Sequence, residues 1–481
     1  MNGISIIIII LLYFGLLFAI SLLTGKKHSG NAAFFLGNRK SPWYIVAIGM
    51  IGSSLSGITF VSVPGMVGKF DMTYMQMAMG FVLGYAVIAF ILLPVYYKLN
   101  TAGIYSYLND RIGRRAYKTA AGFFILSRMA VAATRLYIAV LILQTYVFDA
   151  WNVPFAVTAA GFLLMIWLYT HKSGIRTIVW TDLLQTFFLI VALIIIIWQV
   201  AVGLNLDFAG IIASVKESPH ARIFVFDDWY SQQNFFKQFL GGMFVTIAMT
   251  GIDLEMMQKN LSCKNLRDAQ KNVCTCSLFF IPVNLLFLCL GILTLNYARI
   301  NHIALPAMGD DILPTLISNG YFGTVAIVFF TIGIIAVTFA SADSALAGLT
   351  TSICVDFLEV DKHSEKEARK IRLSVHFTVS LAFVGIMLLF KVINNTSVID
   401  ALYKIVSYTY GPLLGLFAFG ILFKRRTRDR FVPYICIVAP VICFVGNLLL
   451  QATTGYRFGY ELLIVNAALV VAGLVSAASF K

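Results

Sequence analysis

Charged residues are scarce in this chain. Asp, Glu, Lys and Arg together make up 12% of its 481 residues, whereas soluble proteins carry about 25%. Hydrophobic residues reach 59%, and the mean hydropathy is +0.86. One soluble core cannot hold that excess, because soluble domains are only about 45–50% apolar. The composition therefore excludes a soluble globular protein and predicts an integral membrane protein.

Motifs for catalysis and for tight metal binding are also lacking. The seven cysteines are odd in number, lie in apolar segments or basic loops and show no metal-ligand spacing. We interpret them as free thiols in apolar surroundings. The six histidines form neither an HExxH motif nor a cluster. We also find no catalytic dyad, and we therefore expect neither an enzyme activity nor a cofactor.

Long polar segments, which a soluble domain would need, are missing as well. The longest stretch between apolar runs is about 204–235. The first run has no Lys or Arg before it and no small-residue cleavage site, so we expect a retained helix rather than a cleaved signal. A helix needs about 20 apolar residues to cross a bilayer, and this predicts one all-α transmembrane domain over 1–481 with about thirteen spans. The expected spans are 3–23, 43–66, 74–97, 118–147, 153–170, 176–203, 236–257, 274–298, 321–355, 371–390, 397–423, 431–451 and 459–478.

Positive charge is concentrated in alternate loops between these spans. The net charge is +14, and clusters of Lys and Arg mark cytoplasmic loops. This pattern predicts an outside N-terminus and a cytoplasmic C-terminus in the cell (inner) membrane, and it accounts for the charge without a nucleic-acid partner. The basic groups fall within 26–40, 98–118, 172–176, 259–271, 362–372 and 424–430, and Lys259 is assigned to the fourth of these basic loops.

Small and polar residues interrupt two spans at mid-membrane. Unwound helices at this depth often form transporter binding sites, because their freed carbonyls can coordinate a cation. The alternative is close helix packing through small residues. Each interrupted span would be the first helix of a five-helix bundle. This arrangement predicts an inverted repeat of 43–203 and 236–423 flanked by extra helices at 3–23 and 431–478. The interrupting residues are Gly52, Ser53, Ser54, Ser56 and Gly57 in the first case and Thr246, Thr250 and Gly251 in the second.

Asp182 and Asp343 are acidic residues that lie inside spans. Asp182 is about two turns into its span, where an isolated carboxylate costs roughly 2.5–3.5 kcal/mol and should have a partner. The alternative is a residue that snorkels near the cytoplasmic end. Asp343 lies at the edge of a stripe that contains Ser341 and Ser344. Carboxylates, hydroxyls and carbonyls form the oxygen cage that a hard cation such as Na⁺ prefers, although a Ser/Gly stripe can also serve packing alone.

Three cations also lie inside spans. Arg128 and Arg135 are seven residues apart and share one helix face. Because arginine stays charged, each needs an anion, either a carboxylate of the substrate or an acid of the protein. Lys404 lies one turn from Asp400, and we interpret this pair as structural.

Several segments, taken in order, resemble a known family. They are 34–39 (FFLGNR), 56–64 (SGITFVSVP), 178–185 (IVWTDLLQ), 341–351 (SADSALAGLTT) with 355–357 (VDF), and 411–417 (GPLLGLF). Together they resemble the sodium/solute symporter family, which includes sugar, proline, iodide and sialic acid carriers. The resemblance covers nearly the whole chain. It implies the five-plus-five inverted repeat of the leucine-transporter fold.

The resemblance also implies sodium ligands. The family's shared sodium site implies backbone carbonyls of Gly52, Leu55 and Val337 and the hydroxyl of Ser341, while the usual second hydroxyl position is Ala340 here. Members with a second sodium site place it between the acid matching Asp182 and hydroxyls near Ser344, and the carboxylate of Asp343 could offset the missing hydroxyl. Two sodium ions per substrate is therefore a hypothesis.

Within the family, the segment 54–64 is most similar to the bacterial sialic acid carriers. That resemblance implies substrate contacts from the hydroxyls of Ser54, Ser56 and Thr59, and a grip on the carboxylate by Arg128 or Arg135. The family's substrate glutamine aligns with Ala78, so Gln76, two residues earlier, is the candidate amide. Thr246 at the second interruption completes the expected substrate set.

We therefore expect a sodium-coupled symporter that imports a small organic solute of the carboxylated-sugar class, such as sialic acid, by alternating access. The expected partners are Na⁺, the solute and the lipid bilayer, with no nucleic acid and no obligate protein partner. Carriers of a neutral sugar, an amino acid or another organic anion stay open. A proton-coupled carrier that uses Asp182 or Asp343 stays open too.

Overall fold

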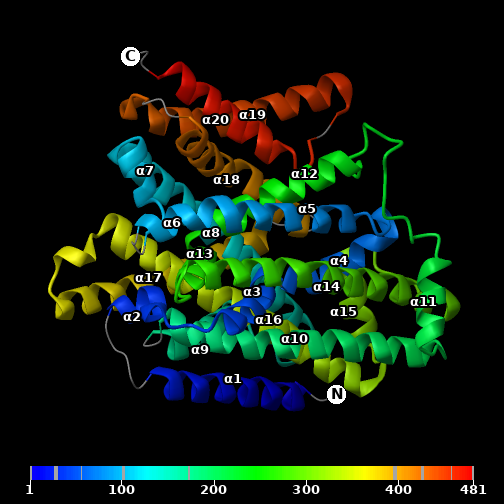
Figure 1. Cartoon of the computed structure of the whole chain (residues 1–481). Coiled ribbons are helices and arrows are strands. Elements are labelled where there is room, and N and C mark those ends of the chain that lie inside the picture. The colour runs from blue at the N-terminus through cyan, green and yellow to red at the C-terminus, as the bar shows by residue number, and fades with distance from the viewer. Residues whose placement is uncertain are drawn as a thin grey trace.

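The computed structural model describes residues 3–25, 31–55, 57–99, 103–171, 174–393, 398–423, 427–456 and 458–478. Within these ranges the chain is helical, and the β pairing described there amounts to two isolated bridges, Ser41 with Cys263 and Thr427 with Ala478. The long helices run roughly side by side as one bundle (Figure 1). This arrangement is the all-α membrane fold that the composition predicts.

The helices of the first half alternate long spans with short connecting turns. They are α1 (Gly3–Gly25), α2 (Asn31–Leu36), η1 (Gly37–Arg39), α3 (Trp43–Ser54), α4 (Gly57–Phe70), α5 (Tyr74–Val87), η2 (Ile88–Leu92), α6 (Leu93–Leu99), α7 (Ser106–Arg111), α8 (Arg114–Leu143), η3 (Gln144–Phe148), η4 (Asp149–Trp151), α9 (Phe155–Thr170) and α10 (Ile175–Gly203).

The second half follows the same scheme. Its helices are α11 (Phe208–Lys216), α12 (Phe235–Thr246), η5 (Ile247–Gly251), α13 (Leu254–Leu261), α14 (Leu266–Ile300), α15 (Gly309–Ser318), α16 (Gly323–Ser352), η6 (Ile353–Phe357), η7 (Val360–Lys362), α17 (Glu365–Ile393), α18 (Val398–Leu422), η8 (Asp429–Phe431), α19 (Val432–Thr454) and α20 (Leu462–Ser476).

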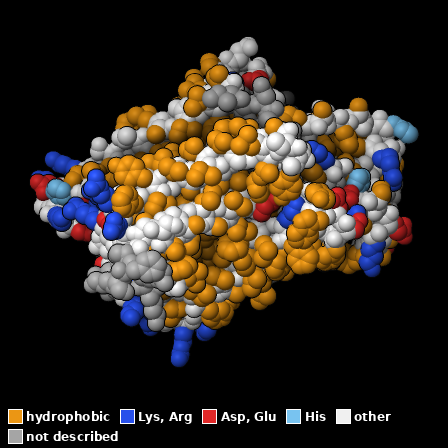
Figure 2. Space-filling model, turned by 90° about the horizontal axis from the view of Figure 1, so that it is seen from above, with side chains coloured by type: hydrophobic (Ala, Val, Ile, Leu, Met, Phe, Trp, Pro, Cys, Tyr) orange, Lys and Arg blue, Asp and Glu red, His pale blue; other side chains and the backbone are white. Residues whose placement is uncertain are grey.

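Thirteen segments of the described ranges have the apolar character of membrane spans. Nine are long helices, two are bent pairs (α3 with α4, and α12 with α13), and two are the shorter apolar helices α9 and α20. Each overlaps one of the apolar runs in the sequence. The surface also fits a membrane-spanning protein, because Figure 2 shows a broad hydrophobic belt between charged ends of the molecule.

Burial separates central from peripheral helices. About 72% of the most apolar window of α16 with η6 is buried, against 28% for α1 and 17% for α19. Figure 1 places α1 and the pair α19–α20 at opposite edges of the bundle. The peripheral helices therefore present apolar faces to lipid, while α16 is enclosed by protein on nearly all sides.

Both polar interruptions in the sequence are breaks in the structure. The axes of the helices Trp43–Ser54 and Thr59–Phe70 differ by 53°, and those of Phe235–Gly251 and Leu254–Leu261 by 67°. Leu55 has extended dihedrals and ends α3. In the second break, Asp253 caps α13 by accepting from the backbone amides of Glu255 and Met256.

The carbonyls released at the second break find partners on other helices. The Tyr96 hydroxyl donates to the Gly251 carbonyl at 2.9 Å, and the Tyr105 hydroxyl donates to the Ile252 carbonyl at 3.1 Å. An unpaired carbonyl is costly at this depth. These tyrosines therefore stabilise the bend between α12 and α13.

Small residues bring α3 against α10. A Cβ on Gly52 would lie 2.1 Å from Thr186 Oγ1, and a Cβ on Gly49 would lie 2.9 Å from the Cβ of Asp182. Only glycine permits this approach. The first interruption thus serves both of the roles considered for it, a break in the helix and close packing.

Corresponding helices of the two halves have corresponding neighbours. α10 packs on α16 as α18 packs on α8, and α5 packs on α12 as α14 packs on α4. These paired contacts are those that an exchange of 43–203 with 236–423 would produce. The inverted repeat itself stays a prediction.

Candidate substrate and cation site

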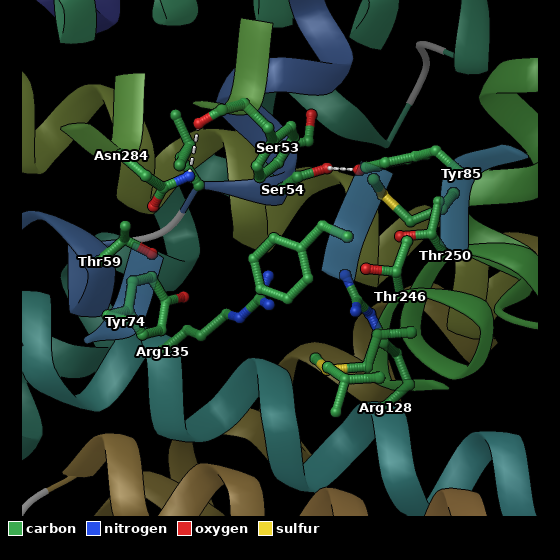
Figure 3. A pocket seen from close by; sticks show the side chains of 16 residues that line it. Ser53, Ser54, Thr59, Tyr74, Tyr85, Arg128, Arg135, Thr246, Thr250 and Asn284 are labelled. Atoms are coloured by element: carbon green, nitrogen blue, oxygen red, sulfur yellow. Dashed lines mark hydrogen bonds between the residues drawn. The ribbon is translucent and has the colours of Figure 1, made fainter. Parts of the chain in front are cut away.

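A cavity lies where the first broken helix faces the second. Its wall is formed by residues of α3, α4, α5, α8, α12, η5, α13 and α14. Aromatic and methionine side chains supply its apolar part, including Phe81, Met249 and Phe280. Its polar side chains are Ser53, Ser54, Thr59, Tyr74, Tyr85, Arg128, Arg135, Thr246, Thr250 and Asn284, and Figure 3 shows them around one space.

Most of the expected substrate residues line this cavity. The hydroxyls of Ser54 and Thr59 come from the two sides of the first break, and Thr246 comes from the end of α12. Arg128 and Arg135 reach the cavity from α8 (Figure 3). Ser56 lies outside the described residues.

Gln76 is placed elsewhere. Its side chain is fully buried, and its amide nitrogen donates to the Gln233 carbonyl at 2.9 Å, while its amide oxygen accepts from the Val225 amide at 3.1 Å. It therefore fastens the segment after α11 to the start of α5. It is not among the residues that line the cavity.

The cavity also contains polar residues that sequence reasoning did not single out. The Tyr85 hydroxyl lies 3.4 Å from Ser54 Oγ. Asn284 is buried in α14, and its amide nitrogen donates to the Phe280 carbonyl at 2.8 Å while its side-chain oxygen has no partner among the described residues. An asparagine in the middle of an apolar run was the signal that could have identified it.

The two arginines of α8 differ in surroundings. Arg128 is 1% exposed, lies 3.6 Å from Asp253 Oδ2 through Nη1, and forms an ion pair with Glu255 through Nη2. Both acids are fully buried, and Asp253 also accepts from the Tyr410 hydroxyl at 2.6 Å. Of the two anions considered for it, Arg128 therefore pairs with acids of the protein. Arg135 is only partly buried at the cavity wall.

The expected sodium ligands lie on α3 and α16. α3 ends at Ser54, so its last carbonyls lack the following turn of helix whose backbone amides would donate to them. A Cβ on Gly57, at the start of α4, would lie 3.9 Å from Thr338 Oγ1, which sets the first break beside the part of α16 that holds Val337 and Ser341. The Ser341 hydroxyl is buried and has no hydrogen-bond partner among the described residues. The donor set suits a hard cation.

A second group of polar residues lies behind this break. Asp182 is 1% exposed, so the snorkelling alternative is excluded. Its Oδ2 accepts from Ser53 Oγ at 3.0 Å and lies 2.7 Å from Lys259 Nζ. On α16, Asp343 accepts from the Tyr169 hydroxyl at 2.9 Å and from Ser344 Oγ at 3.1 Å.

The assignment of Lys259 to a basic loop is wrong. The chain continues past the second break as α13, and all eight residues of that helix are buried. Lys259 is 1% exposed and also donates to Ser53 Oγ at 2.6 Å. The broken seventh span therefore carries its lysine back into the protein and supplies the partner that Asp182 requires.

Comparison with known proteins agrees with this architecture. The sequence model of the sodium:solute symporter family matches residues 34–429. A sodium/sialic acid symporter of Aliivibrio fischeri is 23% identical over 98% of this chain and 92% of its own length. A sodium/sialic acid symporter of Proteus mirabilis is 21% identical over 97% and 94%.

A solved structure has the same fold. It is the substrate-bound, outward-open state of a Na⁺-coupled sialic acid symporter, with a TM-score of 0.82, 19% identity and 98% coverage of both chains. Because the family match spans most of the chain, the protein is a membrane transporter rather than an enzyme, and it belongs to the sodium:solute symporter family.

Proposed function

We propose that this chain is a sodium-coupled symporter that imports a small carboxylated solute of the sialic acid class by alternating access. One observation carries the proposal. A half-buried guanidinium, that of Arg135, lies among hydroxyl groups in a cavity between two broken helices. That combination suits a polyhydroxylated anion and suits a neutral hexose less well.

Arg135 is the proposed carboxylate anchor. A guanidinium presents two parallel N–H donors that match the two oxygens of a carboxylate. Arg128 is less suited to this role because it is almost fully buried between Asp253 and Glu255, whereas Arg135 is partly exposed at the cavity wall. Ser54, Thr59 and Asn284 would bind hydroxyl or amide groups of the solute, and the ring of Phe280 would contact its apolar face. Two relatives that cover nearly the whole chain carry sialic acid.

The coupling ion is proposed to bind between α3 and α16. Carbonyls of Gly52, Leu55 and Val337 and the hydroxyl of Ser341 are the proposed ligands. The same break that offers these carbonyls carries Ser54 and Thr59 into the substrate cavity. Ion and solute would therefore each order the segment that the other needs, and this mutual stabilisation is the physical basis of coupling.

Release of the ion and the solute on the side of the membrane opposite to their entry would require α13 to move. Arg128 lies seven residues closer than Arg135 to the basic start of α8, and its ion pairs with Asp253 and Glu255 close that side of the cavity. We assign that side to the cytoplasm and the protein to the cell (inner) membrane, with the N-terminus outside. Separation of α13 from α8 would break these contacts and open an inward path.

Ligand-induced stabilisation tests the substrate class. The purified protein would be heated with sialic acid, a simple sugar acid, a neutral hexose or an amino acid, each in sodium chloride or choline chloride. We expect sialic acid or the sugar acid to raise Tm in sodium only. The methyl ester of sialic acid is the matched control, because it lacks the negative charge and should lose most of the shift. A larger shift from the neutral hexose would contradict the proposal.

A proton-coupled carrier is the second candidate. Two buried carboxylates, Asp182 and Asp343, interact with one ammonium, that of Lys259, so the group has one acid in excess. A proton could balance that excess in place of an ion. Uptake that follows a pH gradient in the absence of sodium would favour this candidate.

A further inference from the structure

The ammonium of Lys259 binds the carboxylate at which the resemblance placed a second sodium ion. Its Nζ is 2.7 Å from Asp182 Oδ2 and 2.6 Å from Ser53 Oγ. A sodium ion held between Asp182 and α16 would use the same carboxylate. Ammonium and Na⁺ carry the same charge, and each is attracted to the oxygens that the other would use.

The fold keeps this lysine in place. α13 begins at the Asp253 cap, and Tyr96 and Tyr105 hold the two carbonyls just before it. At the end of α13, the Ser41 amide donates to the Ser262 carbonyl at 3.1 Å. In this conformation the helix is therefore held by hydrogen bonds at both ends, and its lysine reaches Asp182.

The carboxylate of Asp182 already has one cation beside it, the ammonium of Lys259. Asp182 and Asp343 repel one another, and both are attracted to Lys259. Oδ1 of Asp182 is buried and has no hydrogen-bond partner among the described residues. A mobile cation at Asp182 would share its carboxylate with a fixed ammonium in a region of low dielectric, where like charges repel strongly.

On the basis of the function proposed above, we propose that Lys259 is a tethered cation that replaces a second coupling ion at Asp182. This carrier then couples transport to one sodium ion, bound between α3 and α16. The pair Asp182 and Asp343, with Ser344, is a latent cation site that the lysine keeps closed. Removal of the ammonium would open it to sodium.

Two neutral variants test this proposal by sodium binding rather than by transport. Lys259→Ala creates space and Lys259→Gln keeps a polar side chain, so one remains informative if the other fails to fold. The purified proteins would be titrated with sodium chloride at constant ionic strength set by choline chloride, and Tm recorded. Each bound ion adds an equal increment per tenfold rise in sodium above its Kd, so we expect the Tm shift per decade in the variants to be about twice that of the wild type.

Further variants test whether the larger Tm response to sodium comes from a cation bound at Asp182. Lys259→Arg keeps the charge and should retain the wild-type sodium dependence. Lys259→Ala combined with Asp182→Asn removes both the ammonium and the carboxylate, and it should lose the gain. Equal slopes for Lys259→Ala, Lys259→Gln and the wild type would overturn the proposal.

The Hill coefficient of sodium-driven uptake gives an independent measure. The expected value is about one for the wild type, since one ion binds cooperatively with the solute. A wild-type coefficient near two would overturn the inference and leave sodium coupling intact. Wild-type uptake without any sodium dependence would instead reject the proposed function, and the Tm titrations would still report on the latent site.

Discussion

At the residue scale, the two arginines of α8 differ in their burial and surroundings. Arg128 is enclosed with Asp253 and Glu255, and these acids come from a helix more than a hundred residues further along the chain. Arg135 lies at the cavity wall and is partly exposed. The proposed function therefore gives the same residue type two purposes, closure of the cavity and recognition of an anion.

Substitution of each arginine should have a distinct effect. Arg128→Ala leaves two buried carboxylates without their partner, and loss of one member of a buried pair costs about 3–5 kcal/mol. We expect a large fall in Tm. Arg135→Ala should lower Tm much less but raise KM for the carboxylated solute about tenfold to a hundredfold, since a hydrogen bond to a charged group contributes about 1.5–3 kcal/mol.

Arg135→Lys is the matched control for the second substitution. It keeps the charge but not the paired donors, so it should restore part of the affinity. Uptake kinetics and Tm of the purified variants check both expectations. Full affinity in Arg135→Ala would show that another group holds the carboxylate.

Neither the choice between the arginines nor the position of Lys259 could be predicted from sequence. Both depend on α13, whose sequence Leu254–Leu261 is polar enough to look like the start of a loop. The helix is buried in protein rather than in lipid, so hydropathy does not identify it. Asp182 could be identified, because a carboxylate far inside an apolar run requires a partner.

At the element scale, the helix breaks could be predicted from the sequence, but the side chains that stabilise them could not. Clustered small and polar residues marked the ends of α3 and α12, and both helices end near them. Tyr96 and Tyr105, which hold the released carbonyls of the second break, come from helices far away in the sequence. The role of Gln76 could not be predicted for the same reason, because its hydrogen-bond partners lie in the segment after α11.

The contact of α3 with α10 gives a test at this scale. A Cβ on Gly52 would lie 2.1 Å from Thr186 Oγ1, so Gly52→Ala forces the two helices apart and should cost about 1–3 kcal/mol of stability. Because the shift also moves the carbonyls at the end of α3, we expect weaker sodium stabilisation. Tm in sodium and in choline measures both effects.

Gly15→Ala is the matched control. Gly15 lies in α1, and a Cβ there would meet nothing within 4 Å. Its Tm and its sodium response should equal those of the wild type. If Gly52→Ala also behaved like the wild type, the close approach of α3 and α10 would not determine the cation site.

At the scale of the whole molecule, the nine long apolar helices and the two bent pairs of the described ranges each overlap an apolar run of the sequence, because hydropathy reports directly on contact with lipid. The total of thirteen spans stays a prediction. α1 begins and α20 ends on opposite sides of the bundle (Figure 1). The distribution of basic loops predicts that the C-terminal side faces the cytoplasm.

This orientation is testable with reporters. A fluorescent protein that matures only in the cytoplasm should be bright when fused after residue 481, and alkaline phosphatase, which is active only outside, should be inactive there. The reverse activities should follow when the phosphatase is inserted in the segment 217–234, between α11 and α12. A bright fluorescent fusion within that segment would invert the proposed topology.

Sodium-driven uptake into proteoliposomes tests the central claim most directly. Labelled sialic acid would be supplied with an inward gradient of sodium, potassium or choline, with pH equal and buffered on both sides. We expect accumulation with sodium alone, and its loss when the sodium gradient is dissipated. Equal accumulation with potassium or choline would contradict it.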